Sequence, residues 1–199
     1  MATRLSLKIG TKVRLENYNE IIGIAGVGGI GSNVAKILGQ SGVSNLKIID
    51  FDHVEFSNLN RQFYFASQIN KPKVDMLKDN LKKIIPDVRI IKEMKRLTES
   101  NLIPSFSECE IIVEGLDTKK DKIMLLETLQ GKKSLIVSAS GIAGNQMETV
   151  KVKKLGKSCY IIGDFYSDVN SFDIFPPKVF YIASIMASIV LNYINKVEK

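Results

Sequence analysis

The sequence predicts an α/β fold, with a mostly parallel sheet, helices on both faces and a small antiparallel extension at the C-terminal end. The prediction rests first on short apolar runs that alternate along the chain with amphipathic stretches of helical period. It rests also on the loop Gly26–Gly31, which joins the first apolar run to a helix-like segment. No repeat, low-complexity tract or linker divides the 199 residues, so residues 1–199 are expected to form a single domain.

The first strand and one amphipathic helix show the clearest patterns. Glu20–Gly26 is a continuous apolar run closed by glycine, which suits a strand buried on both faces. Lys71–Ile85 has one apolar stripe, a proline in its first turn and a second proline directly after it. The other predicted strands are Leu46–Asp50, Val88–Lys92, Glu110–Glu114 and Leu135–Ser138, and the other predicted helices are Ile30–Gln40, Ser100–Phe106 and Thr118–Gln130.

The two ends of the chain differ from this alternating middle. Met147–Lys153 and Cys159–Ile162 are predicted to be strands of the antiparallel extension. Two prolines then open a long apolar helix over Val179–Tyr193. Met1–Asn19 is predicted to supply a short helix or arm packed outside the main sheet.

The composition excludes several classes of protein. The net charge is +7 and the pI is near 9.3, but the lysines are scattered and tryptophan is absent, so nucleic acid is not an expected partner. Cys109 and Cys159 belong to no Cys-x-x-Cys pair, which argues against a zinc site and a disulfide-stapled domain. The apolar stretch Ile182–Leu191 is too short, and too interrupted by serine, for a membrane span. We expect a cytoplasmic protein without a membrane partner.

The glycine loop indicates a nucleotide site. A strand, a glycine turn and a helix follow one another, so backbone N–H groups at the helix N-terminus can face a phosphate. Gly26, Gly28 and Gly31 have the dinucleotide-binding spacing, and Asp50 stands where a ribose-binding acid belongs. This context makes the fold Rossmann-like. Taken alone, the motif leaves NAD, FAD, S-adenosylmethionine and ATP open.

The segment that follows, DFDHVEFSNLNRQ, is unusually rich in polar side chains. Asp50 is the better candidate for the ribose hydroxyls. Asp52 is expected on the same side of the strand, where it either binds magnesium indirectly or caps the following turn. Beyond these acids, the side chains expected to reach along a phosphate chain are Ser57, Asn58, Asn60 and Arg61.

Two cations favour a triphosphate over NAD. Arg61 and Lys73 provide fixed positive charge where pyrophosphate would gain negative charge, which an NAD site does not require. Asp117 follows the strand Glu110–Glu114, where it either binds magnesium or caps the next helix, and Thr118 stands beside it as a further nucleotide-site candidate.

These motifs together resemble one family. The runs GVGGIG, IIDFDHVEFSNLNRQ, KPKV and GLDT strongly resemble the ThiF/MoeB/HesA family, the bacterial relatives of ubiquitin-activating enzymes. The resemblance extends from about Glu20 to the closing segment PPKVFYIASIMASIVL. The short length is most similar to the compact ThiF branch, which adenylates the sulfur carrier ThiS.

The resemblance implies an enzyme that uses ATP and magnesium to adenylate the C-terminal glycine of a small ubiquitin-like sulfur carrier with a Gly-Gly tail. It also implies a homodimer in which an arginine of the partner subunit reaches the site, with Arg14 as our choice and Arg4 as the alternative. The roles carried over are the nucleotide loop for Gly29, the ribose for Asp50, the phosphates for Asn58, Arg61 and Lys73, and magnesium for Asp117.

The chain also departs from the family pattern. Longer relatives carry two Cys-x-x-Cys pairs that hold zinc, and this sequence has neither, so the segment after Gly144 is expected to hold together by packing alone. Cys159 falls near the first zinc pair rather than at the cysteine that longer ThiF proteins join to the carrier. We therefore expect adenylation without a covalent carrier intermediate. The alternatives are an NAD-dependent oxidoreductase, a non-catalytic nucleotide-binding or scaffold protein, or activation of a carrier of the molybdopterin synthase type. The resemblance also leaves open the activation of a small molecule or an RNA base.

Overall fold

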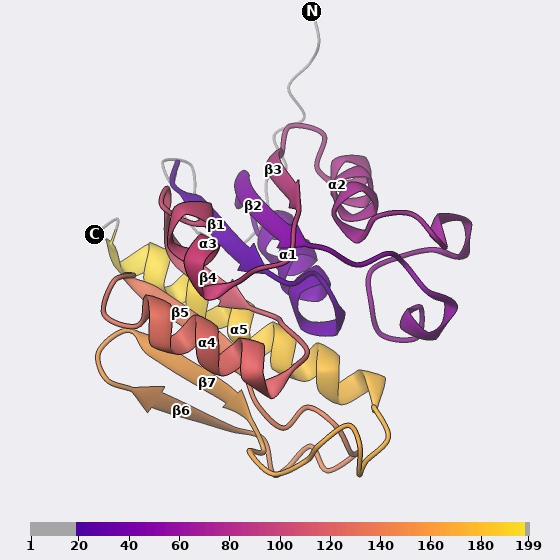
Figure 1. Cartoon of the computed structure of the whole chain (residues 1–199), viewed down its shortest axis with the longest axis vertical. Helices are drawn as coiled ribbons and strands as arrows, with labels where there is room; N and C mark the ends of the chain where they lie inside the picture. The colour runs from indigo at the N-terminus through magenta and orange to yellow at the C-terminus, as the bar shows by residue number, and fades with distance from the viewer. Residues whose placement is uncertain (1–18, 198–199) are drawn as a thin grey trace, which may run out of the picture.

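The computed structural model of the chain describes residues 19–197, with side chains to residue 196. It shows one seven-stranded sheet between two layers of helices (Figure 1). The predicted N-terminal arm before Asn19, with Arg4 and Arg14, lies outside the described residues.

The sheet has the strand order β3-β2-β1-β4-β5-β7-β6. All neighbouring pairs are parallel except β6 and β7. The chain runs outward from β1 to β2 and β3, then crosses back to β4 on the other side, so a crevice is expected at the carboxyl ends of β1 and β4. The strands are β1 Ile21–Ala25, β2 Asn45–Asp50, β3 Arg89–Met94, β4 Cys109–Glu114, β5 Leu135–Ala139, β6 Lys151–Leu155 and β7 Cys159–Gly163.

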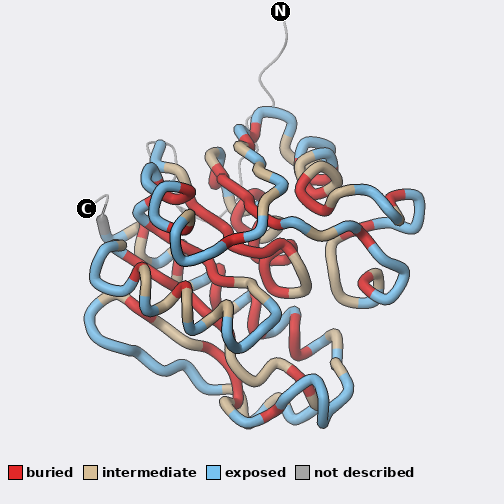
Figure 2. The backbone as a smooth tube through the Cα atoms, in the orientation of Figure 1, coloured by how far each residue is buried: buried red, intermediate tan, exposed pale blue. Residues whose placement is uncertain are grey.

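The helices cover both faces of the sheet. One core joins α1, α2 and α5 to the sheet through side chains such as Val34, Leu81 and Ile182, and a second core joins α3 and α4 through Leu102 and Leu125. Figure 2 shows these buried segments in the middle of the molecule, with exposed loops around them. The helices are α1 Gly29–Gln40, α2 Lys73–Ile84, α3 Glu99–Ser105, α4 Lys119–Leu129 and α5 Pro176–Val197.

The predicted α/β class, the Rossmann-like fold and the small antiparallel extension are confirmed, but the extension differs from the prediction in two details. Strand β6 begins at Lys151 rather than at Met147, because the Val150 N–H donates to the Met147 carbonyl and closes a turn. The strand predicted at Cys159–Ile162 is β7, which pairs parallel with β5. Only β6 is therefore antiparallel.

Helix α5 is longer than the apolar stretch on which the membrane argument rested. Its segment Pro176–Lys196 is long and apolar enough to cross a membrane. In the structure this helix packs against α1 and β5, and Ile182, Met186 and Val190 are fully buried. Burial in the core accounts for its apolar face. That the protein has no membrane partner stays a prediction.

Candidate active site

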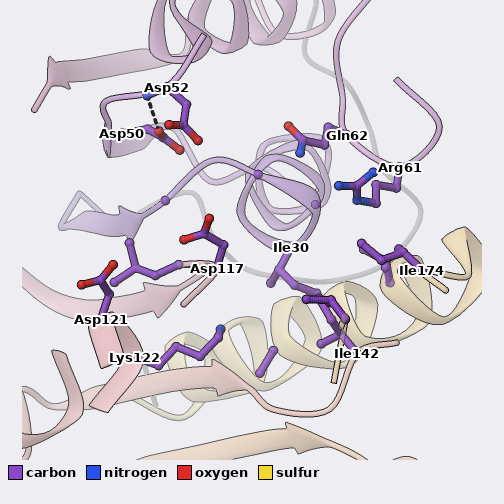
Figure 3. Close-up of a pocket in the computed structure, with 18 of the residues that line it drawn as sticks. Ile30, Asp50, Asp52, Arg61, Gln62, Asp117, Asp121, Lys122, Ile142 and Ile174 are labelled. Atoms are coloured by element: carbon purple, nitrogen blue, oxygen red, sulfur yellow. Dashed lines mark hydrogen bonds between the residues drawn. The ribbon is translucent and has the colours of Figure 1, made fainter. Parts of the chain in front are cut away.

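A cleft of about 680 Å³ opens at the carboxyl ends of the parallel strands (Figure 3). Its lining comes from the glycine loop, the end of β2, the segment 55–62, the segment after β3 and the start of α4. The loops after β5 and β7 complete it. The cleft thus lies where the strand order reverses, which is the place where ligands bind in open α/β sheets.

The glycines of the loop divide into two roles. Gly26, Gly28 and Gly29 line the cleft, whereas Gly31 does not. A Cβ on Gly31 would lie 1.9 Å from the carbonyl oxygen of Gly26, and Gly26 itself has a φ of +83°. Gly26 and Gly31 therefore allow α1 to approach β1 closely, and this approach brings the N-terminus of α1 to the cleft. No side chain caps that N-terminus, so its first N–H groups are available to an anion.

Asp50 is the carboxylate that joins the glycine loop to the cleft. It ends β2 with 9% of its surface exposed, and accepts hydrogen bonds from the N–H groups of Val27 at 2.7 Å and Asp52 at 2.8 Å. Burial raises the pKa of Asp50, and these hydrogen bonds and the charge of Lys73 oppose that rise. The carboxylate is therefore held in one orientation at the edge of the cleft, as a ribose ligand requires.

Lys73 and Asp52 form an ion pair that the sequence did not predict. The Lys73 Nζ lies 2.9 Å from the Asp52 carboxylate, and the Lys73 N–H donates to the Asp52 carbonyl at 2.9 Å. Strand β2 ends at Asp50, so the alternation of a strand does not place Asp52 as predicted. The position of Asp52 depends instead on its two contacts with Lys73, the first residue of α2. Lys73 is 5% exposed, so its charge is fixed at the cleft and matched by Asp52.

Arg61 is differently placed. Its guanidinium donates to the Ser57 carbonyl at 2.8 Å and to the Asn60 side chain at 2.9 Å. Within residues 19–196 it has no carboxylate partner, and burial lowers its pKa. Asn33 donates to the carbonyls of Gly29, at 2.6 Å, and Arg61, at 2.8 Å, which ties the arginine to the loop. A half-buried cation without a counter-charge beside a glycine loop favours an anionic ligand.

The other polar residues of the 55–62 segment mostly support this arrangement. Asn58 lines the cleft, but its side-chain oxygen accepts the Glu55 N–H at 3.1 Å. Ser57 and Asn60 are not part of the lining. Ser57 donates to Glu55, and Asn60 accepts from Arg61. The structure therefore brings Asn58 and Arg61 to the cleft, and places Ser57 and Asn60 behind Arg61.

Asp117 lies across the cleft, and its carboxylate has no ion-pair partner among the residues that the structure describes. It is exposed and lines the cleft beside the start of α4 (Figure 3). The residue that caps α4 is Thr118, whose hydroxyl accepts the Asp121 N–H at 3.1 Å, so Asp117 is not the cap and Thr118 stays outside the lining. Below it, the fully buried Glu114 binds Lys122 at 3.0 Å, which fixes the end of β4.

Several cleft residues were missed by sequence reasoning. Gln62 lines the cleft, and its side-chain oxygen is buried without a hydrogen-bond partner in the part of the chain that the structure describes. Arg96 stacks 4.7 Å over the ring of Phe51, and both also line the cleft. Asn33 supports the loop as described above. A polar residue within the apolar α1 segment was an available signal for Asn33, whereas the Arg96–Phe51 pair joins two strand ends far apart in the sequence.

Comparison with known proteins gives the family. The sequence profile of the ThiF family matches residues 7–199. The chain belongs to the ThiF family. The family match spans both the glycine loop and the segment Asn60–Gln62. It does not distinguish the short ThiF branch from the other branches of the family.

Two relatives of this ThiF-family chain show the range of its similarity. A tRNA threonylcarbamoyladenosine dehydratase of Bacillus subtilis is 30% identical over 71% of this chain and 56% of its own. A molybdopterin-synthase adenylyltransferase of Escherichia coli is 30% identical over 69% of this chain and 55% of its own. The chain thus spans about half the length of these relatives.

Solved structures agree on the fold. The E. coli tRNA N6-threonylcarbamoyladenosine dehydratase TcdA in complex with ATP superposes with a TM-score of 0.83 at 18% identity, over 94% of this chain and 90% of that one. E. coli MccB with its partner MccA superposes with a TM-score of 0.74 at 21% identity, over 92% of this chain and 58% of that one. At these identities the likeness shows a shared fold.

Proposed function

We propose that this chain is an ATP-dependent adenylyltransferase that activates the C-terminal glycine of a small ubiquitin-like sulfur carrier. In this proposal the carrier resembles ThiS and serves thiamine biosynthesis, and the enzyme acts as a cytoplasmic homodimer. One observation carries the proposal. The half-buried guanidinium of Arg61 and the carboxylate of Asp117 line the same cleft at the N-terminus of α1, and neither has an ion-pair partner within residues 19–196. The phosphates of ATP would pair with the Arg61 guanidinium, and a divalent cation bound to these phosphates would pair with the Asp117 carboxylate.

The described cleft offers groups that suit the phosphates and the ribose of ATP. The N–H groups at the start of α1 and the side chain of Arg61 favour phosphates. Asp50, at the end of β2, presents a fixed carboxylate that suits the ribose hydroxyls. The TcdA structures that share this fold were solved in complex with ATP and with AMP, which supports a nucleotide as the ligand.

Asp117 fits the magnesium ion that such a triphosphate carries. Magnesium prefers oxygen ligands and is usually held by one or two carboxylates together with substrate phosphates and water. The described residues contain no group of three or more acidic, histidine or cysteine side chains that could hold a metal alone. The ion would therefore be shared between Asp117 and the phosphates, where it would neutralise part of their charge.

The proposed reaction is a displacement at the α-phosphorus of ATP. A carboxylate oxygen of the carrier forms the new P–O bond, the bond to the bridging oxygen breaks, and pyrophosphate leaves with that electron pair. Attack by one anion on another is opposed by charge repulsion, which Arg61 offsets where the negative charge develops. Lys73, held by Asp52, would add a second fixed cation once phosphate oxygens compete for it.

The far side of the cleft favours a protein acceptor over RNA. Ile142, Tyr166, Val169 and Ile174 line it, and residues 158–177 contain no lysine, arginine or histidine. We name these four side chains the acceptor wall. A wall without cations suits a slim Gly-Gly tail, whereas a polynucleotide needs cations along its phosphates. The molybdopterin-synthase adenylyltransferase and the NEDD8-activating subunit among the relatives support this choice.

Cys159 does not suit a covalent carrier intermediate. It lies in β7 with 1% of its surface exposed, outside the cleft lining, and burial raises its pKa. A thiol must ionise and reach the substrate to act as a nucleophile. The proposal therefore ends at the acyl-adenylate.

Transfer of label from ATP tests the proposed acceptor. The chain is incubated with magnesium, ATP labelled at the α-phosphate and a ThiS-like carrier ending in Gly-Gly. We expect label on this carrier and none on a matched carrier that lacks its terminal glycine. In a parallel incubation with tRNA in place of the carrier, release of labelled AMP that requires tRNA, with no label on the carrier in the first incubation, would contradict the proposal and favour the activity named for the dehydratase relatives.

A further inference from the structure

The acceptor wall is built from two loops that hydrogen bonds join into one unit. The Phe165 N–H donates to the Ser140 carbonyl at 3.2 Å, and the Gly144 N–H donates to the Asp173 carbonyl at 2.9 Å. These bonds connect the loop after β5 with the loop after β7. Figure 3 shows Ile142 and Ile174, one from each loop, among the side chains that line the cleft. The position of the wall relative to the phosphate end of the cleft thus depends on what holds this unit.

A fully buried ion pair holds it. The Lys178 Nζ donates to the Asp164 carboxylate at 2.6 Å and to the Ala143 carbonyl at 2.6 Å, and both charged side chains are 0% exposed. The other carboxylate oxygen of Asp164 accepts the N–H groups of Tyr166 and Ser167, each at 2.9 Å. One pair therefore contacts both loops and the first turn of α5.

The surroundings leave this arrangement little freedom. A Cβ on Gly141 would lie 2.0 Å from Asp164 Oδ1, and Gly141 has a φ of +74°. Phe165, next to the acid, also has a positive φ of +71°. A non-glycine residue persists in that conformation only where its neighbours hold it.

The same helix turn reaches the nucleotide loop. Val179 follows Lys178, is fully buried, and lies 3.3 Å from the position that a Cβ on Gly29 would take. Helix α5 is itself anchored along α1, by far its most extensive helix contact. The start of α5 is thus a fixed point that contacts the phosphate side of the cleft through Val179 and the acceptor side through Lys178.

We propose that Lys178 and Asp164 are positioning residues that set the acceptor wall against the phosphate site, an inference that rests on the proposed adenylation. Stability alone does not explain the pair, because well-packed apolar residues generally replace a buried ion pair without loss of stability. An ion pair with three further hydrogen bonds instead fixes one loop geometry. Binding of the carrier's Gly-Gly tail therefore depends on the position of the acceptor wall, whereas ATP binding depends on the glycine loop that Val179 contacts.

The test compares Lys178→Met with the double variant Lys178→Met/Asp164→Asn in carrier-dependent pyrophosphate exchange. In both variants we expect the KM for the Gly-Gly carrier to rise by about 10²-fold, because a small misplacement of a bound group can cost that much. We expect the KM for ATP to stay within about twofold, since both variants leave in place Val179 and the packing of α5 along α1, which hold the nucleotide loop. The single variant leaves Asp164 buried and unpaired, so it should melt at a lower temperature than the double variant.

If the double variant recovers the wild-type melting temperature while its KM for the carrier stays high, the loss of carrier binding cannot be due to a loss of stability. The pair would then act by positioning the acceptor wall. An unchanged carrier KM in the folded double variant would overturn the inference, as would equal rises in the two KM values. Amide exchange keeps the test independent of activity. The N–H groups of Tyr166 and Ser167 should lose protection in both variants, and those of β1 and β4 should keep it. Retained protection at Tyr166 and Ser167 would also overturn the inference, whereas a wild-type chain without carrier-dependent exchange would count against the proposed function alone.

Discussion

Arg61→Ala is expected to lower the rate of pyrophosphate exchange by about 10²–10³-fold, the range found when one preorganised donor to a developing charge is removed. Arg61 lines the cleft beside the glycine loop and has no carboxylate partner within residues 19–196, so ligand phosphates are its natural counter-charge. Lys119 also lines the cleft without such a partner, but it is exposed at the start of α4. Lys73 and Lys122 also line the cleft, but each already binds a carboxylate. Their charge cannot replace that of Arg61 at the start of α1.

The matched control for this variant is Arg89→Ala. Arg89 begins β3, is exposed and lies outside the cleft lining, so its removal changes the net charge equally without touching the site. Exchange in Arg89→Ala should equal that of the wild type. Normal exchange by a folded Arg61→Ala protein would remove Arg61 from the proposed mechanism.

Gly31→Ala is expected to destabilise the fold and abolish nucleotide binding together. The added Cβ would lie 1.9 Å from the Gly26 carbonyl oxygen, a contact between two backbone segments that no side-chain rotation relieves. Overpacking of this kind costs about 3 kcal/mol, and a chain of this size then loses roughly 6–12 °C in Tm. Thermal unfolding and ATP titration by calorimetry measure the two effects.

Gly28→Ala is the control for the steric argument. A Cβ there would meet only the side chain of Gln62 at 3.7 Å, an ordinary contact, and Gly28 has a φ of −77°. Its free energy of unfolding should stay within about 0.5 kcal/mol of the wild type. If Gly31→Ala were as stable as Gly28→Ala, the close approach of α1 to β1 would not be the reason for glycine at position 31.

The sequence predicted the sheet well because its central strands are buried on both faces. Ile22, Ile48, Ile112 and Val137 have almost no exposed surface, and such strands appear as continuous apolar runs between breakers. Strand β6 gave no such signal, because every residue from Lys151 to Leu155 is exposed. Its start was therefore predicted four residues too early.

The sequence predicted several residues that line the cleft, but not the ion pairs that hold its parts together. Asp50, Arg61 and Asp117 follow from strand ends and the glycine loop, since parallel strands bring their carboxyl ends together. The pairs Asp52–Lys73 and Asp164–Lys178 join different elements, and each residue alone is a common surface type. Pattern along the chain does not show that a lysine is buried, because burial depends on where two elements meet.

The same limit corrects the expectation for the C-terminal part of the chain. Without Cys-x-x-Cys pairs, the segment after Gly144 was expected to hold together by packing alone. The structure instead joins its loops to α5 through the buried Asp164–Lys178 pair and its hydrogen bonds. Hydrogen bonds and the pairing with Lys178 hold the pKa of Asp164 below its ordinary value although burial acts to raise it, so the carboxylate stays charged at neutral pH.

Pyrophosphate exchange into ATP tests the central claim most directly. The full chain is incubated with magnesium, ATP and labelled pyrophosphate, with and without a purified Gly-Gly-tailed ThiS-like carrier. The account predicts exchange that requires both the carrier and its terminal glycine, and that is lost in Arg61→Ala. No exchange from a chain that still binds ATP would contradict the proposed acceptor. Tight binding of NAD without binding of ATP would contradict the account as a whole.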